Sequence, residues 1–199
     1  MAKIKRKQKP PAGITDCRRF KKYLRLDFER HCAYCHQAEN LHLTYHYFGV
    51  EHFKPRSKYP KLIATYSNLL YCCNRCNSIK GEFWPSRQDL AAGRRLLDPC
   101  VDDHAVHLGV NPQTGAIVPK SEAGDFFARH LYLDREELLV WRARKAPLQE
   151  RVRTLEEILR QLEDETAPGA NDAKMVETLQ DTLDEFEAAL AEYGSYWTD

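Results

Sequence analysis

Two stretches decide the fold of this chain, Cys32-Ala33-Tyr34-Cys35 and Cys73-Asn74-Arg75-Cys76. Each is a C-x-x-C pair, which holds two thiolates at the spacing of a zinc knuckle. Four cysteine ligands fill a tetrahedral Zn²⁺ ion, so the predicted site is structural and not catalytic. Cys72 adjoins the second pair, but only Cys73 leaves the two-residue gap to Cys76. Buried cysteines that share this spacing by coincidence are the alternative interpretation.

Polar residues follow a characteristic order around these pairs. Glu51-His52 lies ahead of Pro55, Asn68-Leu69 precedes the second pair, and Asn77 and Lys80 follow its last cysteine. Over about residues 28–85, this order resembles the HNH (ββα-metal) endonuclease family. The resemblance implies a ββα-metal core with His52, Asn68 and Asn77 at the three named positions. Glu51 is a departure, since Asp is commoner before the histidine.

The chemistry of phosphodiester hydrolysis suggests a role for each of these residues. A water must lose a proton, and neutral imidazole is the side chain best suited to take it near pH 7. A cation must also stabilise the phosphate oxygens, and hard ions prefer oxygen ligands. We therefore expect His52 to be the general base and Glu51 and Asn77 to bind catalytic Mg²⁺ or Mn²⁺. The resemblance implies that Asn68 braces the loop that holds His52.

Four basic residues are expected to contact nucleic-acid phosphates. Lys54, Arg56 and Lys58 lie in the loop after His52, and Lys80 lies one helical turn beyond Asn77. Phosphate contacts of this kind position a protein on nucleic acid without reading its sequence. Outside the motif, the same lysines and arginine would be interpreted as an ordinary solvated surface.

The periodicities predict short strands, added helices and a C-terminal antiparallel helical hairpin, and the resemblance implies a zinc-stabilised ββα-metal (HNH) core, so the expected fold class is α+β. A helix is expected from Thr15 or Asp16 to about Arg30. The core itself is expected to comprise strands at 50–53 and 68–72 and a helix at 74–81. We predict four parts along the chain: a flexible basic arm at 1–12, an HNH nuclease domain at 13–100, a hairpin and helices that extend the core at 101–147, and an acidic helical hairpin at 148–199.

The net charge of +1 over 199 residues conceals a strong asymmetry. Residues 1–100 carry +12, residues 101–149 carry −1 and residues 150–199 carry −10. Such asymmetry indicates nucleic-acid or membrane binding on one side of the molecule. The acidic part disfavours DNA, and its heptad seam from Leu148 predicts either a self-contained solvated hairpin or a docking surface for a protein partner.

A narrower resemblance concerns the particular residues of the motifs, which are CAYC, EHFKP and NLLYCCNRCN, followed by an Asp-Pro-Cys segment. They resemble the HNH subunits of bacterial anti-phage systems such as Septu. That resemblance implies an ABC- or SMC-like ATPase partner. Double-stranded DNA is the favoured substrate, and a double-strand break suggests two copies in a homo- or hetero-oligomer. A catalytically silent zinc module, which binds nucleic acid or scaffolds a complex, is the alternative, and an RNA nuclease is a third.

The composition excludes several other classes. A hydrophobic content of 43% argues against disorder. No apolar run approaches the roughly 20 residues of a membrane span, and no apolar region follows the basic N-terminus as in a secretory signal. Paired cysteines without such a signal favour metal over disulfides and predict a cytoplasmic location.

Overall fold

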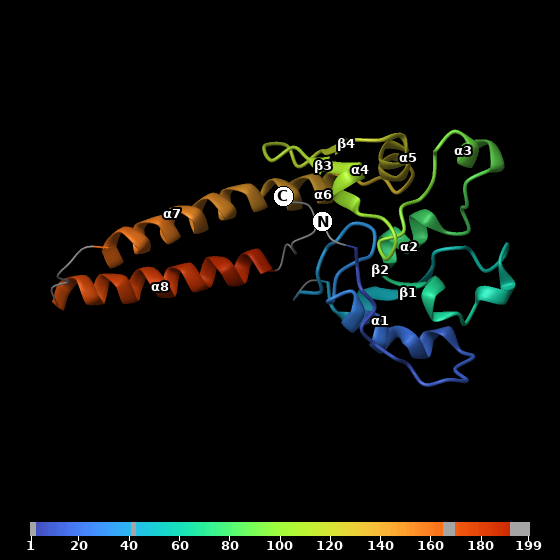
Figure 1. Ribbon diagram of the computed structural model, residues 1–199, viewed down its shortest axis with the longest axis horizontal. Coiled ribbons are helices and arrows are strands. Elements are labelled where there is room, and N and C mark those ends of the chain that lie inside the picture. Colours follow the sequence, from blue (N-terminus) through green and yellow to red (C-terminus); the bar gives the residue numbers. More distant parts are fainter. Residues whose placement is uncertain (1–2, 41–42, 165–169, 192–199) are drawn as a thin grey trace.

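The computed structural model describes residues 3–40, 43–164 and 170–191. Figure 1 shows a body that contains both small sheets and two long helices that project from it. The α+β class predicted from the sequence is confirmed, because short antiparallel strands and helices are combined in one chain. Among the described residues, no helix has both the length and the apolar character needed to cross a bilayer.

A two-stranded sheet and one helix form the centre of the body. Strands β1 (Phe48–His52) and β2 (Leu69–Cys73) pair antiparallel, with Phe48 opposite Cys73 and His52 opposite Leu69. Helix α2 (Asn74–Lys80) begins at the residue after β2 and packs on both strands. Every residue of β2 is buried, since the strand lies between α2 and α1 (Lys21–Asp27). This is the predicted ββα order, with the strands shifted from the predicted positions by one or two residues.

The first helical segment is shorter than expected. The Asp16 carboxylate accepts a hydrogen bond from Arg18 N and caps a 3₁₀ turn (Cys17–Phe20), which continues into α1. The predicted helix to about residue 30 instead ends at Asp27. Glu29 and Arg30 have φ of 49° and 62°, a left-handed conformation that an α-helix does not accommodate.

The basic N-terminal segment contradicts the prediction of a flexible arm at 1–12. Ile4 is buried, and its backbone N donates to Pro99 O at 2.8 Å. Arg6 Nη2 donates to Leu69 O at 2.7 Å, and Lys7 N donates to the Asp27 carboxylate at 2.7 Å. Residues 4–8 are therefore packed on the core, because an apolar and a guanidinium side chain alternate with the lysines.

The part after the motif continues the same hydrophobic core. That core extends from Ile4 to Leu138 without a break between the predicted divisions 13–100 and 101–147. For example, the Phe127 ring packs on Tyr34 of the knuckle, with ring centroids 6.0 Å apart. The elements of this part are α3 (Arg87–Ala91), α4 (His104–His107), β3 (Leu108–Val110), β4 (Ile117–Pro119), α5 (Glu122–His130) and α6 (Glu136–Ala143).

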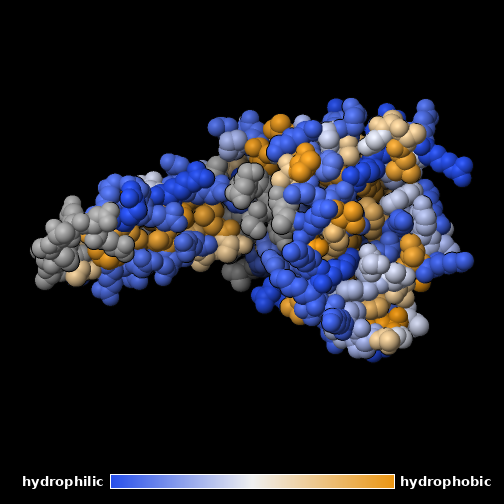
Figure 2. Space-filling model, in the orientation of Figure 1, coloured by the Kyte–Doolittle hydropathy of each residue, from blue (hydrophilic) through white to orange (hydrophobic). Residues whose placement is uncertain are grey.

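The C-terminal helices α7 (Lys145–Asp164) and α8 (Ala170–Ala191) lie side by side, as the heptad pattern predicts. Their seam has a small core of its own, which contains Val152, Leu159 and Leu183. Figure 2 shows an apolar line along this seam and hydrophilic residues over the outer surfaces. Pro147 lies in the first turn of α7, where the missing N–H costs nothing, so it begins a helix and does not kink one. The predicted hairpin runs to residue 199, and its residues 165–169 and 192–199 lie outside the described residues.

Candidate active site and metal centre

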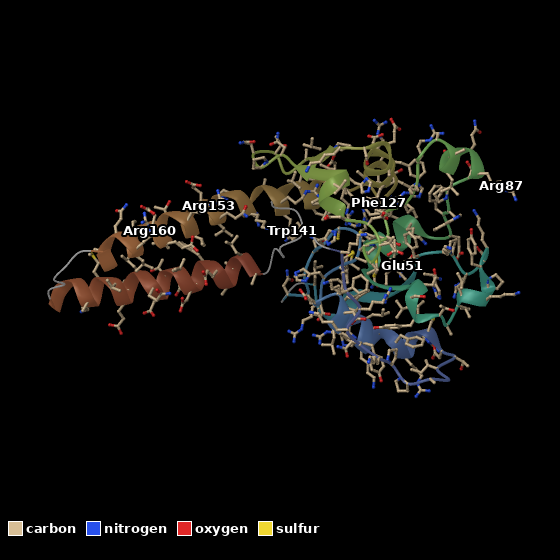
Figure 3. The ribbon with its side chains drawn as sticks, viewed as in Figure 1. Glu51, Arg87, Phe127, Trp141, Arg153 and Arg160 are labelled. Atoms are coloured by element: carbon tan, nitrogen blue, oxygen red, sulfur yellow. The ribbon has the colours of Figure 1, made fainter. Side chains whose placement is uncertain are left out.

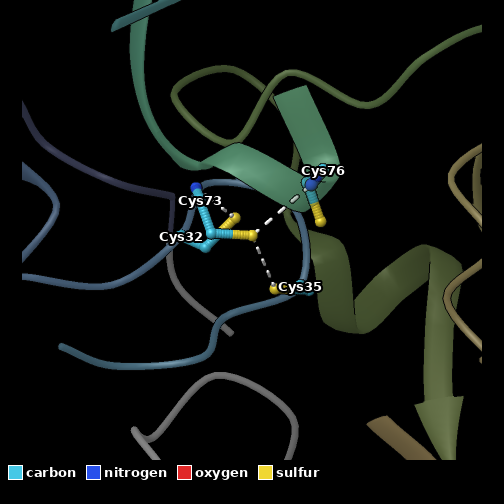
Figure 4. Close-up of side chains that lie close together, drawn as sticks. All are labelled: Cys32, Cys35, Cys73 and Cys76. Atoms are coloured by element: carbon cyan, nitrogen blue, oxygen red, sulfur yellow. Dashed lines mark hydrogen bonds between the residues drawn. The ribbon is translucent and has the colours of Figure 1, made fainter. Parts of the chain in front are cut away.

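The four cysteines of the two C-x-x-C pairs lie together. Cys32 and Cys35 come from the knuckle, Cys73 ends β2 and Cys76 lies in the first turn of α2, as Figure 4 shows. Their sulfur atoms all lie within 4.8 Å of one another, and all four side chains are fully buried. A tetrahedral ion with Zn–S bonds of about 2.3 Å requires sulfurs about 3.8 Å apart. Cys35 Sγ and Cys73 Sγ are 3.8 Å apart, which fits that requirement.

Backbone N–H groups support the same cluster. Cys73 N donates to Cys32 Sγ at 3.4 Å, and Cys76 N donates to Cys73 Sγ at 3.5 Å. Such bonds stabilise negative charge on a thiolate sulfur. Soft thiolates select zinc over hard cations, so the donor set could hold a structural Zn²⁺. Cys72 is also buried, with its Sγ 3.7 Å from Cys32 Sγ, but it does not belong to the four-sulfur group.

Arg135 is a further contact of this cluster, and the sequence reasoning missed it. Its Nη2 donates to Cys76 Sγ at 3.4 Å, and its side chain is only 8% exposed. The guanidinium places a positive charge beside sulfurs that would carry negative charge as thiolates. Arg135 lies 59 residues after Cys76, just ahead of α6, so no local spacing could have identified it.

A cleft of about 520 Å³ opens at the end of β1. Glu51 and His52 of β1 and Asn77 of α2 line it, so the structure brings three of the predicted catalytic residues to one cavity. Arg56 and Glu82 contribute another wall. The remaining wall is the helix start that contains Asp16, Cys17 and Arg18, which sequence reasoning did not connect with the site.

His52 is oriented by a single backbone contact. Its Nε2 lies 2.9 Å from the carbonyl oxygen of Ile63, in the loop between β1 and β2. A carbonyl oxygen can only accept, so the bond assigns the hydrogen of the neutral ring to Nε2. Nδ1 is then the atom with a free lone pair, and the half-exposed side chain lines the cleft.

Asn68 lies beneath this loop and is 7% exposed. Its Oδ1 accepts from Lys54 N at 2.9 Å, and its Nδ2 donates to Lys54 O at 3.1 Å and to Leu62 O at 3.4 Å. Both ends of the loop are thus tied to one amide. Lys54 follows His52 by two residues and Leu62 precedes Ile63, so these bonds position both partners of the His52–Ile63 contact.

Glu51 lies next to His52 but is buried, with 4% exposure. Its Oε1 is 2.5 Å from Lys80 Nζ, and Tyr34 donates its hydroxyl to the same oxygen at 3.5 Å. Burial raises the pKa of Glu51 to about 7, although the charge of Lys80 opposes that rise. Figure 3 shows Glu51 within the body of the molecule.

Lys80 does not occupy the position that its spacing from Asn77 suggested. The side chain is buried, with 2% exposure, and Nζ also donates to His52 O at 2.7 Å. The predicted phosphate contact of Lys80 is therefore wrong. The helical turn does place Lys80 beside β1, but the Glu51 carboxylate and the His52 carbonyl draw its ammonium group inward.

The other predicted residues lie at the surface or on the sheet. Asn77 lies over β1, and its Nδ2 would be 3.6 Å from a Cβ added at Gly49. The Arg56 side chain is 64% exposed and lies 3.6 Å from Glu82. Lys58 is exposed, whereas Lys54 is half-buried with its ammonium over the Tyr59 ring. Of the three predicted loop cations, only Arg56 lines the cleft.

Comparison with known proteins agrees with this geometry. Residues 32–83 match the family model of the HNH endonucleases, so the chain carries an HNH endonuclease domain there. It is 34% identical to Septu protein PtuB of Bacillus thuringiensis over 77 residues, 39% of this chain and 27% of that protein. It is 32% identical to Septu protein PtuB of Bacillus mycoides (strain KBAB4) over 152 residues, 63% of this chain and 50% of that protein.

The chain thus spans half or less of the length of these two curated relatives. No solved structure gives a significant match to it. The matched family segment contains all four cysteines of the cluster and the residues Glu51, His52, Asn68 and Asn77.

Proposed function

We propose that this protein is a metal-dependent endonuclease that hydrolyses phosphodiester bonds in DNA, with His52 as the general base. The observation that carries the proposal is the orientation of His52, whose Nε2–H is held by the Ile63 carbonyl at the mouth of a cleft. This leaves Nδ1 to take a proton from an attacking water. Asn68 acts as a positioning residue, because its amide fixes the loop that supplies the carbonyl.

Glu51 and Asn77 would hold the catalytic cation, Mg²⁺ or Mn²⁺, through their oxygen atoms. When bound, such an ion stabilises the charge that develops on the phosphate and on the leaving oxygen. The carboxylate of Glu51 is paired with Lys80, so we propose that Lys80 keeps the buried carboxylate in place beside the cleft. Arg56 lines the same cleft and would contact the phosphate backbone, as would Lys54 and Lys58 of the loop.

The test is cleavage of supercoiled plasmid with Mg²⁺ or Mn²⁺. We expect nicking by the wild type and a loss of at least about 100-fold in His52→Ala, because general-base catalysis contributes that much. His107→Ala is the matched control, since this histidine ends α4, lies 2.7 Å from Ser121 Oγ through its Nδ1 and does not line the cleft. Zinc content and the circular dichroism spectrum should be unchanged in both variants. Full activity of His52→Ala would refute the assignment, and an inactive wild type on DNA and RNA would favour the catalytically silent zinc module.

We further propose that the nuclease acts in bacterial anti-phage defence, in a complex with an ABC- or SMC-like ATPase in the cytoplasm. The similarity to the two Septu proteins PtuB supports a defence role. The hairpin of α7 and α8 is a suitable docking surface. Its apolar seam is buried between the two helices, so the surface left for a partner is the acidic outer one. The partner surface would then be basic, and charge complementarity would select it.

Charge reversal tests the docking surface while retaining the full chain. Glu156, Glu177 and Glu185 are exposed on the two helices, and replacing all three with lysine should abolish co-purification with the proposed ATPase partner. The same variant should keep its zinc and its basal nicking activity. Undiminished co-purification would show that the hairpin is only a solvated appendage.

A further inference from the structure

The N-terminal segment presents its lysines in one direction. From residue 3 to residue 9, exposed and covered positions alternate strictly. Ile4, Arg6 and Gln8 are buried or half-buried, while the lysines between them are all exposed: Lys3, Lys5, Lys7 and Lys9. A period of two is the pattern of an extended chain with one face on the protein and the other in solvent. The four ammonium groups therefore form a row on one side of the segment.

Hydrogen bonds to buried groups fix this segment in register. The Asp27 carboxylate is 4% exposed and accepts from both Lys7 N at 2.7 Å and Gln8 N at 2.8 Å. Its other oxygen accepts from the Tyr66 hydroxyl at 2.6 Å. Figure 1 shows the segment, in dark blue, passing over the body close to α1, which carries Asp27. One buried carboxylate thus anchors the middle of the lysine row.

Arg6 connects the row with the sheet that carries the candidate general base. Its guanidinium lies 4.9 Å from the centroid of the Tyr66 ring and donates to Leu69 O at 2.7 Å. Leu69 is the register partner of His52 in the β1–β2 pair. The segment is therefore attached at the end of the sheet where the cleft opens.

We propose that Lys3, Lys5, Lys7 and Lys9 form a preformed row that binds the sugar–phosphate backbone of the DNA substrate. This inference rests on the proposed function and adds a binding surface outside the cleft. An extended chain rises about 3.3 Å per residue, so the row is about 20 Å long with a charge every 6.6 Å or so. One DNA strand carries a phosphate about every 3.4 Å along the helix axis. The row therefore spans about six phosphates with four cations.

The segment could instead bind an acidic protein, and the −10 charge of residues 150–199 in a second copy is the obvious candidate. The even spacing favours DNA, because a regular row of exposed charges matches a regular polyanion. Lys7 lies 3.4 Å from Glu29, but both side chains are more than half exposed. An exposed pair of this kind is weak and leaves Lys7 able to exchange its partner.

The first experiment measures binding of the full chain to a fluorescent 30-base-pair duplex over a range of salt concentrations. His52→Ala is the background, so that cleavage does not interfere. Replacing the four lysines with glutamine should weaken binding at least about tenfold at low salt. The slope of log K against log salt is negative, and the substitutions should reduce its magnitude by about 2 to 4, since each phosphate contact contributes about 0.9.

The matched control removes four exposed positive charges elsewhere, in Arg87→Gln, Arg153→Gln, Arg160→Gln and Lys174→Gln. Figure 3 shows Arg87, Arg153 and Arg160 at the outer edges of the molecule, on α3 and α7. The control has the same net charge as the row variant and should keep the wild-type slope. Equal effects of the two variants would mean that only net charge matters, and they would overturn the proposal.

The second experiment separates a fixed row from a loose basic tail. Asp27→Ala keeps every lysine but removes the acceptor of Lys7 N and Gln8 N, and it should weaken duplex binding about threefold or more. Wild-type binding by a folded, zinc-loaded Asp27→Ala protein would overturn the claim that the row is preformed. A row variant that changes the oligomeric state but not DNA binding would assign the lysines to a second copy. Wild-type cleavage tests the proposed function separately, because binding is read in a cleavage-deficient background.

Discussion

The buried pair of Glu51 and Lys80 gives a prediction that can be worked through quantitatively. The Nζ–Oε1 distance is 2.5 Å, and the two side chains are 5% and 1% exposed. Replacing Lys80 with methionine removes one partner and leaves the other carboxyl in an apolar environment. Breaking a buried ion pair in this way costs about 3–5 kcal/mol. We expect a decrease of that size in the free energy of unfolding, measured by urea denaturation of the zinc-loaded protein at pH 8.

The same prediction has a pH dependence whose sign follows from burial. Burial raises the pKa of Glu51 from 4.5 to about 7, so its contribution to stability is fully present below pH 4.5 and is lost as the pH rises through 7. Without Lys80 the pKa of Glu51 rises further. The free energy of unfolding of the variant therefore continues to fall above pH 7, by about 1.4 kcal/mol per pH unit. Lys80→Met should therefore cost less at pH 6, where Glu51 of the wild type is largely protonated, than at pH 8.

Two controls make this test decisive. Lys58→Met changes the same side chain at an exposed position and should alter stability by less than about 0.5 kcal/mol. Adding Glu51→Gln to Lys80→Met removes the buried carboxyl, so the double variant should recover part of the loss at pH 8. A cost of Lys80→Met below about 1 kcal/mol, or one that is constant from pH 6 to pH 8, would refute the reasoning.

Three further outcomes are expected. Cys76→Ser should release zinc and unfold the body, because Cys76 belongs to the four-sulfur group. Cys72→Ser should retain one zinc per chain, measured by metal analysis. Zinc loss from both variants would contradict the predicted set of ligands. Arg135→Gln should weaken zinc retention against a chelator about 10- to 100-fold, as outer contacts of metal ligands do, while Arg129→Gln should not. Asn68→Ala leaves Lys54 N without its acceptor and should cost about 1–3 kcal/mol in unfolding free energy. Asn68→Ala should also reduce nicking. Nicking at the wild-type rate would show that the position of His52 does not depend on the hydrogen bonds of Asn68 to the loop.

Local spacing in the sequence was sufficient to predict the four-cysteine cluster beside the candidate site. The knuckles are visible because zinc coordination dictates the interval between paired cysteines, and the ββα order follows from the resemblance of the motifs to the HNH family. His52 and Asn77 could be proposed because their side chains suit phosphodiester hydrolysis and because they stand at named positions of the motif that resembles the HNH family. The structure brings them to one cleft and so makes the assignment testable.

Long-range packing was not accessible in the same way. The contact of Arg135 with Cys76 and the cleft wall at Asp16 depend on segments that are distant in the sequence. Lys80 was misplaced because helical periodicity fixes the face of a residue but not the burial of its charged end. The charge density of residues 1–12 predicts a flexible arm, but Ile4 and Arg6 within it make contacts that hold residues 4–8 on the core.

The continuity of the hydrophobic core bears on what part of this chain could exist alone. Residues 32–83 are the segment that matches the family model, but they do not contain the whole of the core in which they are packed. Phe28 precedes that segment and Leu97, Phe127 and Leu138 follow it, yet all four are fully buried in the same core. A fragment cut at the family boundaries would expose these contact surfaces to water and lose the arginine beside Cys76. The smallest fragment that can be expected to fold independently therefore begins near residue 3 and ends near residue 143.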